Sequence, residues 1–285
     1  MIRIALRVLV PLLPLGLIWH HLDGAAALGL LAGADLGLIV LALVLLHVQI
    51  VASALRWRVT AAQLGQPLGR RQALAEYYLA ALANIALPGG VLGDAGRAVR
   101  ARGAVGVRAS AQAVVIERLM GQILLFAVLV PGLMLWALPG RGPVLAGVAA
   151  VALASWAALR WGPQPARDFA AASWRAWAPV WRTQLGLSVI VLASLVGAFA
   201  ACSAAVGAPL AAGATMVLVP LTLVAMLLPI SVGGWGLREG VAAVLWPVAG
   251  FSAEAGVAAS IAFGLTALAA ALPGLLVPAL DKRAA

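Results

Sequence analysis

Six charged residues lie in segments of the chain that are otherwise apolar or glycine-rich. They are Asp94, Arg97, Glu117, Arg118, Arg238 and Glu239. The planar guanidinium group of arginine binds phosphate oxygens through parallel hydrogen bonds, and a carboxylate either neutralises such an arginine or holds a cationic headgroup. A charge at the centre of a bilayer costs about 2.5–3.5 kcal/mol on insertion scales, so charges in membrane segments are candidates for function. These residue types suit a phosphate-binding site, and a structural ion network is the alternative.

Two of these arginines end similar glycine-rich motifs. The first motif, LPGGVLGDAGR, spans residues 87–97, and the second, LPISVGGWGLR, spans residues 228–238. Aligned without gaps, they share five residues in eleven positions, including the proline and the final arginine, which we interpret as an internal duplication. Proline breaks helices and glycine permits tight turns. The residues expected to shape these breaks are Pro88, Gly89, Gly90, Gly93, Pro229, Gly233, Gly234 and Gly236. Trp235, inside the second motif, would line the site or contact an acyl chain.

The composition places these motifs in a membrane. Of the 285 residues, 64% are hydrophobic and 10% are charged, with a mean hydropathy of +1.07, whereas a soluble domain has about 25% charged residues. The chain therefore reads as an all-α polytopic membrane protein, a single transmembrane domain over residues 1–285. Apolar segments fall at about 8–22, 36–55, 72–87, 110–138, 143–159, 184–206, 213–228 and 255–280. Most tryptophans, Trp57 and Trp246 among them, fall near segment ends and suit the membrane interfaces.

The positive charges predict the topology. The net charge is +10, and every basic residue except Lys282 is an arginine. These arginines lie in short loops, so the positive-inside rule and anionic headgroups explain them better than nucleic acid does. The arginine clusters at 56–71 and 97–108 are both cytoplasmic only if residues 72–98 enter the membrane and return to the same side. Residues 213–239 must then do the same from the opposite face.

This arrangement gives about six spanning helices and two re-entrant helical hairpins, with both chain ends in the cytoplasm. The hairpins, at about 72–98 and 213–239, form an inverted repeat. Inverted repeats with broken helices are common in transporters, where the substrate site lies at the repeat interface. The three histidines show no metal-ligand spacing, and the single cysteine, Cys202, lies in an apolar run, so we expect no metal site and no cofactor.

Four stretches resemble a known family, the transmembrane flippase domain of bacterial lysylphosphatidylglycerol synthase/flippase proteins and their stand-alone relatives. They are RWRVTAAQLG from residue 56, NIALPGGVLGDAGRAVRAR from 84, ERLMGQILLF from 117 and LPISVGGWGLREG from 228, and the resemblance extends over about 50–280. The resemblance carries over to Pro88, Gly93, Asp94, Arg97, Arg118, Pro229, Gly233, Gly234, Gly236, Arg238 and Glu239. Leu92 departs from it, because a second glycine is usual there. No soluble synthase domain is present, so we expect no aminoacyl transfer.

Together these features favour a lipid flippase or lipid transporter in the bacterial cytoplasmic (inner) membrane, and not an enzyme. An anionic phospholipid or a lipid-linked phosphate would cross between leaflets through a polar cavity between the hairpins. The residues expected to bind it are Asp94, Arg97, Glu117, Arg118, Arg238, Glu239 and Trp235. A homodimer, or a separate synthase or glycosyltransferase partner, stays open. The first alternative function is a non-catalytic membrane partner of such an enzyme. The second, an intramembrane enzyme acting on lipid phosphate, lacks a carboxylate pair or histidine cluster at suitable spacing.

Overall fold

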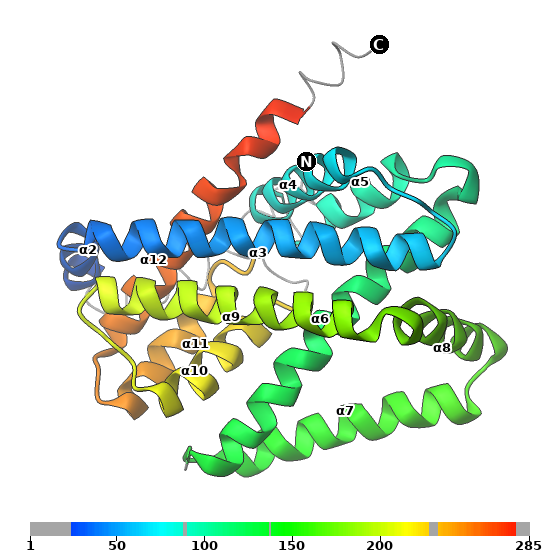
Figure 1. Cartoon of the computed structure of the whole chain (residues 1–285). Helices are drawn as coiled ribbons and strands as arrows, with labels where there is room; N and C mark the ends of the chain where they lie inside the picture. Colours follow the sequence, from blue (N-terminus) through cyan, green and yellow to red (C-terminus); the bar gives the residue numbers. More distant parts are fainter. Residues whose placement is uncertain (1–23, 88–89, 137, 228–232, 278–285) are drawn as a thin grey trace, which may run out of the picture.

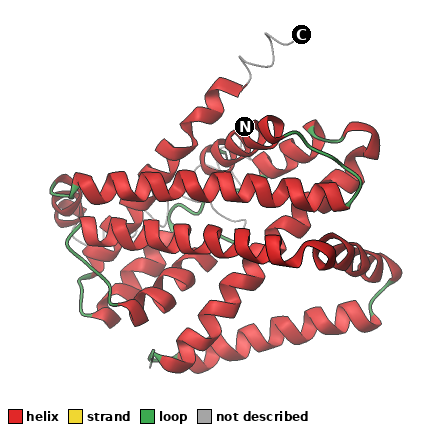
Figure 2. Cartoon of the chain, viewed as in Figure 1, coloured by secondary structure: helices red, strands yellow, loops and turns green. Residues whose placement is uncertain are grey.

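The structure is a computed structural model that describes residues 24–87, 90–136, 138–227 and 233–277. Its secondary structure is helical, with no strand in these ranges (Figure 2). The α-helices are α2 (Gly24–Ala32), α3 (Leu36–Gln63), α4 (Arg70–Ala86), α5 (Leu92–Arg100), α6 (Gly106–Leu135), α7 (Arg141–Trp161), α8 (Gln164–Trp177), α9 (Trp181–Ala205), α10 (Ala212–Ala225), α11 (Leu237–Leu245) and α12 (Ala253–Ala271). Short 3₁₀ turns lie at η1 (Gly103–Val105), η2 (Ala178–Val180), η3 (Trp246–Ala249) and η4 (Leu272–Leu276).

The helices confirm an all-α polytopic membrane protein. Five helical stretches are long and apolar enough to span a bilayer: Leu36–Gln63, Gly106–Leu135, Arg141–Trp161, Gln164–Ala205 and Ala253–Leu276. The first predicted span, at 8–22, lies outside the described residues. Helices α3 and α9 run side by side, and α12 packs against both (Figure 1). Cys202 is buried in this core, as expected. Helix α7 packs only against its neighbours α6 and α8 among the main contacts, and none of its residues is buried.

Helix α3 is longer than the sequence predicts. Asp35 caps its N-terminus, because the Asp35 carboxylate accepts hydrogen bonds from the backbone N–H groups of Gly37 and Leu38, at 2.7 and 3.1 Å. The apolar run was expected to end near residue 55, with Arg56 in a cytoplasmic loop. Instead the helix continues to Gln63, and Arg56 lies inside the protein at 3% exposure. The assignment of Arg56 to a loop was therefore wrong.

The first motif belongs to a helical hairpin, which we call the first hairpin (α4 and α5). The backbone N–H of Gly93 donates to Asn84 Oδ1 at 2.8 Å, and Arg100 pairs with Glu76 at 2.7 Å. These contacts show that α5 runs back along α4. A Cβ atom on Gly93 would collide with the backbone of Ala80, so only glycine permits this close approach. Pro88 and Gly89, expected to shape the break, lie outside the described residues.

The second motif joins α10 to α11, and we call this pair the second hairpin. The two helices pack against each other (Figure 1). Gly234 and Gly236 precede α11 with φ of +86° and +87°, a conformation that favours glycine. The two hairpins meet where Gly233 approaches the backbone of Ile85. Pro229 lies outside the described residues. Entry of the hairpins from opposite membrane faces, and the cytoplasmic position of both chain ends, stay predictions.

Candidate functional site

Arg97 of α5 is fully buried and lies between aromatic rings and carboxylates. Its Nε donates to Asp94 Oδ1 at 2.9 Å, and its Nη2 donates to Glu117 Oε2 at 2.9 Å. The guanidinium carbon lies 4.8 Å from the ring centre of Trp57 and 4.6 Å from that of Tyr77. Both distances are within the range of cation–π contact. The Arg97 side chain is thus held in one orientation from several sides.

Glu117 of α6 joins Arg97 to a second buried arginine. Its Oε1 atom accepts hydrogen bonds from Arg56 Nη2 at 2.6 Å and Nε at 3.2 Å, and from the Tyr77 hydroxyl at 3.3 Å. Arg56 also donates to Ser188 of α9 at 3.1 Å. A single carboxylate therefore ties together α3, α4, α5 and α6, and through Arg56 it reaches α9.

Arg118 points away from Glu117, as expected for adjacent residues on a helix. It pairs with Asp94 Oδ2 at 2.9 Å, and its side chain is 44% exposed. Asp94 therefore bridges the exposed Arg118 and the buried Arg97. Glu117 and Arg118 thus both pair with charged residues of the first motif. We call Arg56, Asp94, Arg97, Glu117 and Arg118 the first-hairpin cluster.

Sequence reasoning missed Arg56, although a signal was present. It lies three residues after Ser53 and four before Thr60, and all three share the buried face of α3. This helical spacing indicates a buried position, but a basic residue at the end of an apolar run was read as a membrane boundary. The interfacial reading of Trp57 and Trp246 was also wrong, because both are fully buried. The indole N–H of Trp246 donates to Ser203 Oγ at 3.0 Å.

Arg238 and Glu239 form a more local arrangement, which with Ser260 of α12 we call the second-hairpin cluster. Arg238 Nη2 donates to Glu239 Oε1 at 2.7 Å, and its Nε donates to Ser260 Oγ at 2.8 Å. The other Glu239 oxygen accepts the backbone N–H of Gly236 at 2.6 Å and so caps α11. The ring centres of Trp235 and Phe263 lie 5.0 and 5.4 Å from the guanidinium carbon of Arg238.

The two arginines lie in separate clusters. Among the described residues, Arg97 and Arg238 share no hydrogen-bond or ion-pair partner. The hairpins nevertheless touch at Ile85 and Gly233. The connecting residues 88–89 and 228–232 lie outside the described ranges. A polar cavity between the hairpins, reached by both arginines, therefore stays a prediction.

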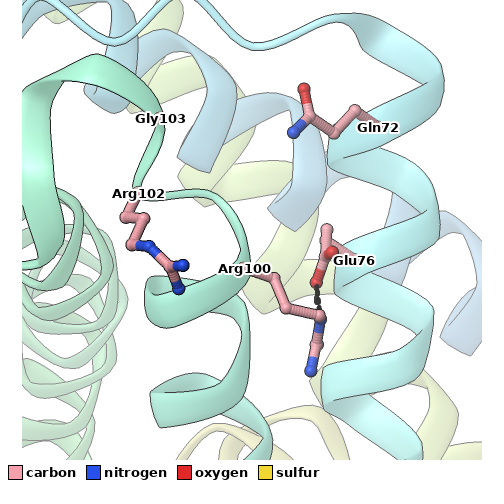
Figure 3. Close-up of a pocket in the computed structure, with 5 residues that line it drawn as sticks. All are labelled: Gln72, Glu76, Arg100, Arg102 and Gly103. Carbon is pink, nitrogen blue, oxygen red and sulfur yellow. Dashed lines mark hydrogen bonds and ion pairs between the residues drawn. The ribbon is translucent and has the colours of Figure 1, made fainter.

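A pocket that the sequence did not suggest opens beside the first hairpin. Its volume is about 620 Å³, and it is lined by Gln72, Glu76, Arg100, Arg102 and Gly103. Figure 3 shows the Glu76–Arg100 ion pair across its wall, with Arg102 on the facing turn. In the described part of the chain, no three or more His, Cys, Asp or Glu side chains are grouped to hold a metal ion.

Comparison with known proteins places these features in one family. The model of the family described as lysylphosphatidylglycerol synthase TM region matches residues 4–274. The match includes both motifs and every residue of the two clusters. No curated protein and no solved structure matches the chain.

Proposed function

The chain belongs to the lysylphosphatidylglycerol synthase TM region family, and from this premise we propose that it moves an anionic lipid between membrane leaflets. Family membership and five apolar helices make it a multi-pass membrane protein related to lipids. The proposed substrate is an anionic phospholipid or a lipid-linked phosphate, and the proposed membrane is the bacterial cytoplasmic one. The proposed action is transport without covalent chemistry.

The observation that carries this proposal is the continuous run of charge from the protein surface to its interior. Arg118 is exposed, Asp94 is mostly covered and Arg97 is fully buried, and each contacts the next. Such charges are costly in a membrane unless they are paired or lead to an aqueous path. Asp94 and Arg97 lie on α5, which follows the helix break of the first hairpin, and irregular backbone at membrane depth is tolerated only inside protein or beside water. A phosphate group approaching Arg118 would therefore meet a series of charged side chains, each more buried than the one before.

In the proposed mechanism, the headgroup moves along this route while the acyl chains stay in the bilayer. At the first hairpin, Arg97 and Arg118 contact the phosphate, and Asp94 and Glu117 are the carboxylates that pair with these arginines when no substrate is bound. The second hairpin offers Arg238, Glu239 and Trp235 as a counterpart, which becomes available when its ion pair opens. The hairpins touch at Gly233 and Ile85, and in this mechanism that contact couples the movement of the two hairpins.

The test is leaflet exchange in proteoliposomes. Fluorescent phosphatidylglycerol is added, and the fraction accessible to an outside quencher is followed over time. We expect wild type to exchange this lipid faster than protein-free vesicles. Arg118→Gln should slow exchange about 10-fold or more, because a charge-assisted hydrogen bond contributes about 1.5–3 kcal/mol.

Arg108→Gln is the matched control for this test. It removes another exposed arginine from the same helix, α6, and should leave exchange unchanged. Equal exchange by wild-type and protein-free vesicles would refute transport of this lipid. Equal exchange by wild type and Arg118→Gln would refute the assignment of the route.

A further inference from the structure

The pocket beside the first hairpin is formed by polar groups from two segments. Gln72 and Glu76 lie on α4, and Arg100, Arg102 and Gly103 lie on the segment that runs from the end of α5 into η1 (Figure 3). None of these five lining residues has an apolar side chain. The volume of about 620 Å³ lies in the range of pockets that bind small molecules. The pocket therefore has room for a small polar ligand but no apolar surface that would hold an acyl chain.

The charges that line this pocket do not balance. Arg100 pairs with Glu76, and both its Nε and its Nη2 donate to a single oxygen, Oε2, at 2.7 Å. Arg102 is exposed and donates to the backbone carbonyl of Val99 at 3.1 Å. Among the described residues, no carboxylate pairs with Arg102. The lining thus carries one positive charge without a counter-charge, which favours an anionic ligand.

The same lining offers groups that recognise hydroxyls. Glu76 is only 8% exposed, and no described residue donates a hydrogen bond to its second oxygen, Oε1. Gln72 is exposed at the pocket and has an amide that both donates and accepts. A Cβ atom added to Gly103 would meet open space, so backbone alone forms that part of the wall. A ligand with hydroxyl groups would bind the carboxylate oxygen and the amide.

We propose that this pocket binds a small, water-soluble phosphate monoester that carries hydroxyl groups. The phosphate contacts Arg100 and Arg102, because a guanidinium group binds phosphate oxygens through parallel hydrogen bonds. The hydroxyls contact Glu76 and Gln72. Phosphate suits two arginines better than a carboxylate does, since it has three terminal oxygens and carries about −1.5 to −2 charges at neutral pH. The pocket shares no residue with the first-hairpin cluster, so this site is separate from the proposed lipid route.

The predicted topology gives such a ligand access from the cytoplasm. Gln72 directly follows the arginine cluster at 56–71, and Arg100, Arg102 and Gly103 lie within the cluster at 97–108. The positive-inside rule predicts that both clusters are cytoplasmic. A lipid headgroup shares the phosphate chemistry, but its acyl chains need apolar contacts that this lining does not offer. Soluble phosphate esters are therefore the source to which the proposal commits.

The experiment is isothermal titration calorimetry of the purified full chain in a neutral detergent. The probes are glycerol 3-phosphate, which carries both groups, inorganic phosphate, which lacks the carbon-bound hydroxyls, and glycerol, which lacks the phosphate. We expect one glycerol 3-phosphate per chain, bound about 10-fold more tightly than inorganic phosphate, and no binding of glycerol. Short-chain phosphatidylglycerol, kept below its critical micelle concentration, should not displace it.

Three variants test the assignment of the groups. Arg102→Gln should weaken binding of both phosphates about 10-fold, through loss of a charge-assisted hydrogen bond. Gln72→Ala should weaken only glycerol 3-phosphate, about 3-fold or more, because it removes a contact to a hydroxyl. Arg108→Gln removes another exposed arginine that does not line the pocket, and it should change neither affinity. Gln72 and Arg102 are exposed, so both variants should keep the wild-type unfolding midpoint.

Four results would overturn the proposal. Equal affinities for glycerol 3-phosphate and inorganic phosphate would show that the hydroxyls are not recognised. An unchanged affinity in Arg102→Gln, or an equal loss in Arg108→Gln, would reduce the binding to general attraction by a basic protein. Displacement by short-chain phosphatidylglycerol would assign the pocket to a lipid headgroup. None of these measurements depends on leaflet exchange, which tests the proposed function separately.

Discussion

Arg97 and Arg238 hold equivalent positions in the two motifs, and both guanidinium groups lie buried against two aromatic rings. Their partners differ. Arg238 pairs with the next residue in its own helix and with Ser260 of α12. Arg97 pairs with Asp94 in its own helix and with Glu117 of α6, which is also bound by Arg56 of α3. The same motif thus supports a local pair in one hairpin and a network between helices in the other.

This difference separates two roles for a buried arginine. The second-hairpin cluster is neutral and ends at residues that also cap α11 and pack α12, so its geometry suits support of the hairpin. The first-hairpin cluster carries an excess positive charge and extends to an exposed arginine. Its geometry suits exchange of a protein carboxylate for a ligand. Four sets of variants test whether this contrast holds.

The largest effect is expected for Glu117→Gln. The substitution leaves Arg56 and Arg97 buried without their shared carboxylate, and loss of one partner of a buried ion pair costs about 3–5 kcal/mol. We expect a pronounced fall in the thermal unfolding midpoint of the purified protein in a single detergent. Asp168→Asn, at an exposed carboxylate on α8, is the control and should not shift it. Equal midpoints would show that the first cluster contributes no stability.

Next in size is the packing of the first hairpin. Gly93→Ala places a methyl group against the backbone of Ala80, and such overpacking costs about 1–3 kcal/mol. Gly96→Ala, on the same helix, meets only the mobile end of Arg100 at 2.9 Å. It should stabilise α5 slightly, because alanine favours helix over glycine by about 1 kcal/mol. Thermal unfolding of both variants tests this, and destabilisation by Gly96→Ala as large as that by Gly93→Ala would contradict the described approach of α5 to α4.

A smaller effect on stability is expected when both residues of the Arg238–Glu239 ion pair are replaced by apolar residues. Buried ion pairs exchanged for apolar side chains of similar volume are often neutral in stability. Arg238→Met combined with Glu239→Leu should therefore stay within about 2 kcal/mol of wild type, the remaining loss being the α11 cap. Arg238→Met alone leaves the Glu239 carboxylate buried without its partner and should destabilise the protein more than the double substitution does.

The same double variant also distinguishes lipid binding from lipid transport. We expect it to keep phosphatidylglycerol binding at the first cluster and to lose leaflet exchange. Loss of binding in a protein that remains folded would show that the two clusters act as one site.

The sequence was sufficient for the features that depend on local pattern. Apolar runs predicted the helices, and proline with glycine predicted a break in each motif. Adjacent residues on a helix point in different directions, and Glu117 and Arg118 accordingly pair with different residues, Arg97 and Asp94.

Features that depend on tertiary contacts were not predictable in the same way. Arg56 and Glu117 are 61 residues apart, and only their pairing explains how an arginine is buried in α3. Without knowledge of that partner, the positive-inside rule assigns Arg56 to a loop. The burial of Trp57 has the same origin, because its ring packs on an arginine from another helix. The charge imbalance of the first cluster became visible only once Arg56 was placed in it.

The smallest effect is expected at the Glu76–Arg100 pair. The Arg100 side chain is 40% exposed beside the pocket of Figure 3, whereas both arginines of the Glu117 network are buried. Water and ions screen such a pair, which typically contributes about 0–1 kcal/mol. Glu76→Gln should therefore shift the unfolding midpoint little, and high salt should reduce the shift further. If Glu76→Gln destabilised the protein as much as Glu117→Gln does, exposure would not explain why the two carboxylates differ in their contribution to stability. The first-hairpin cluster would then have to include the whole face of α4 that carries Glu76.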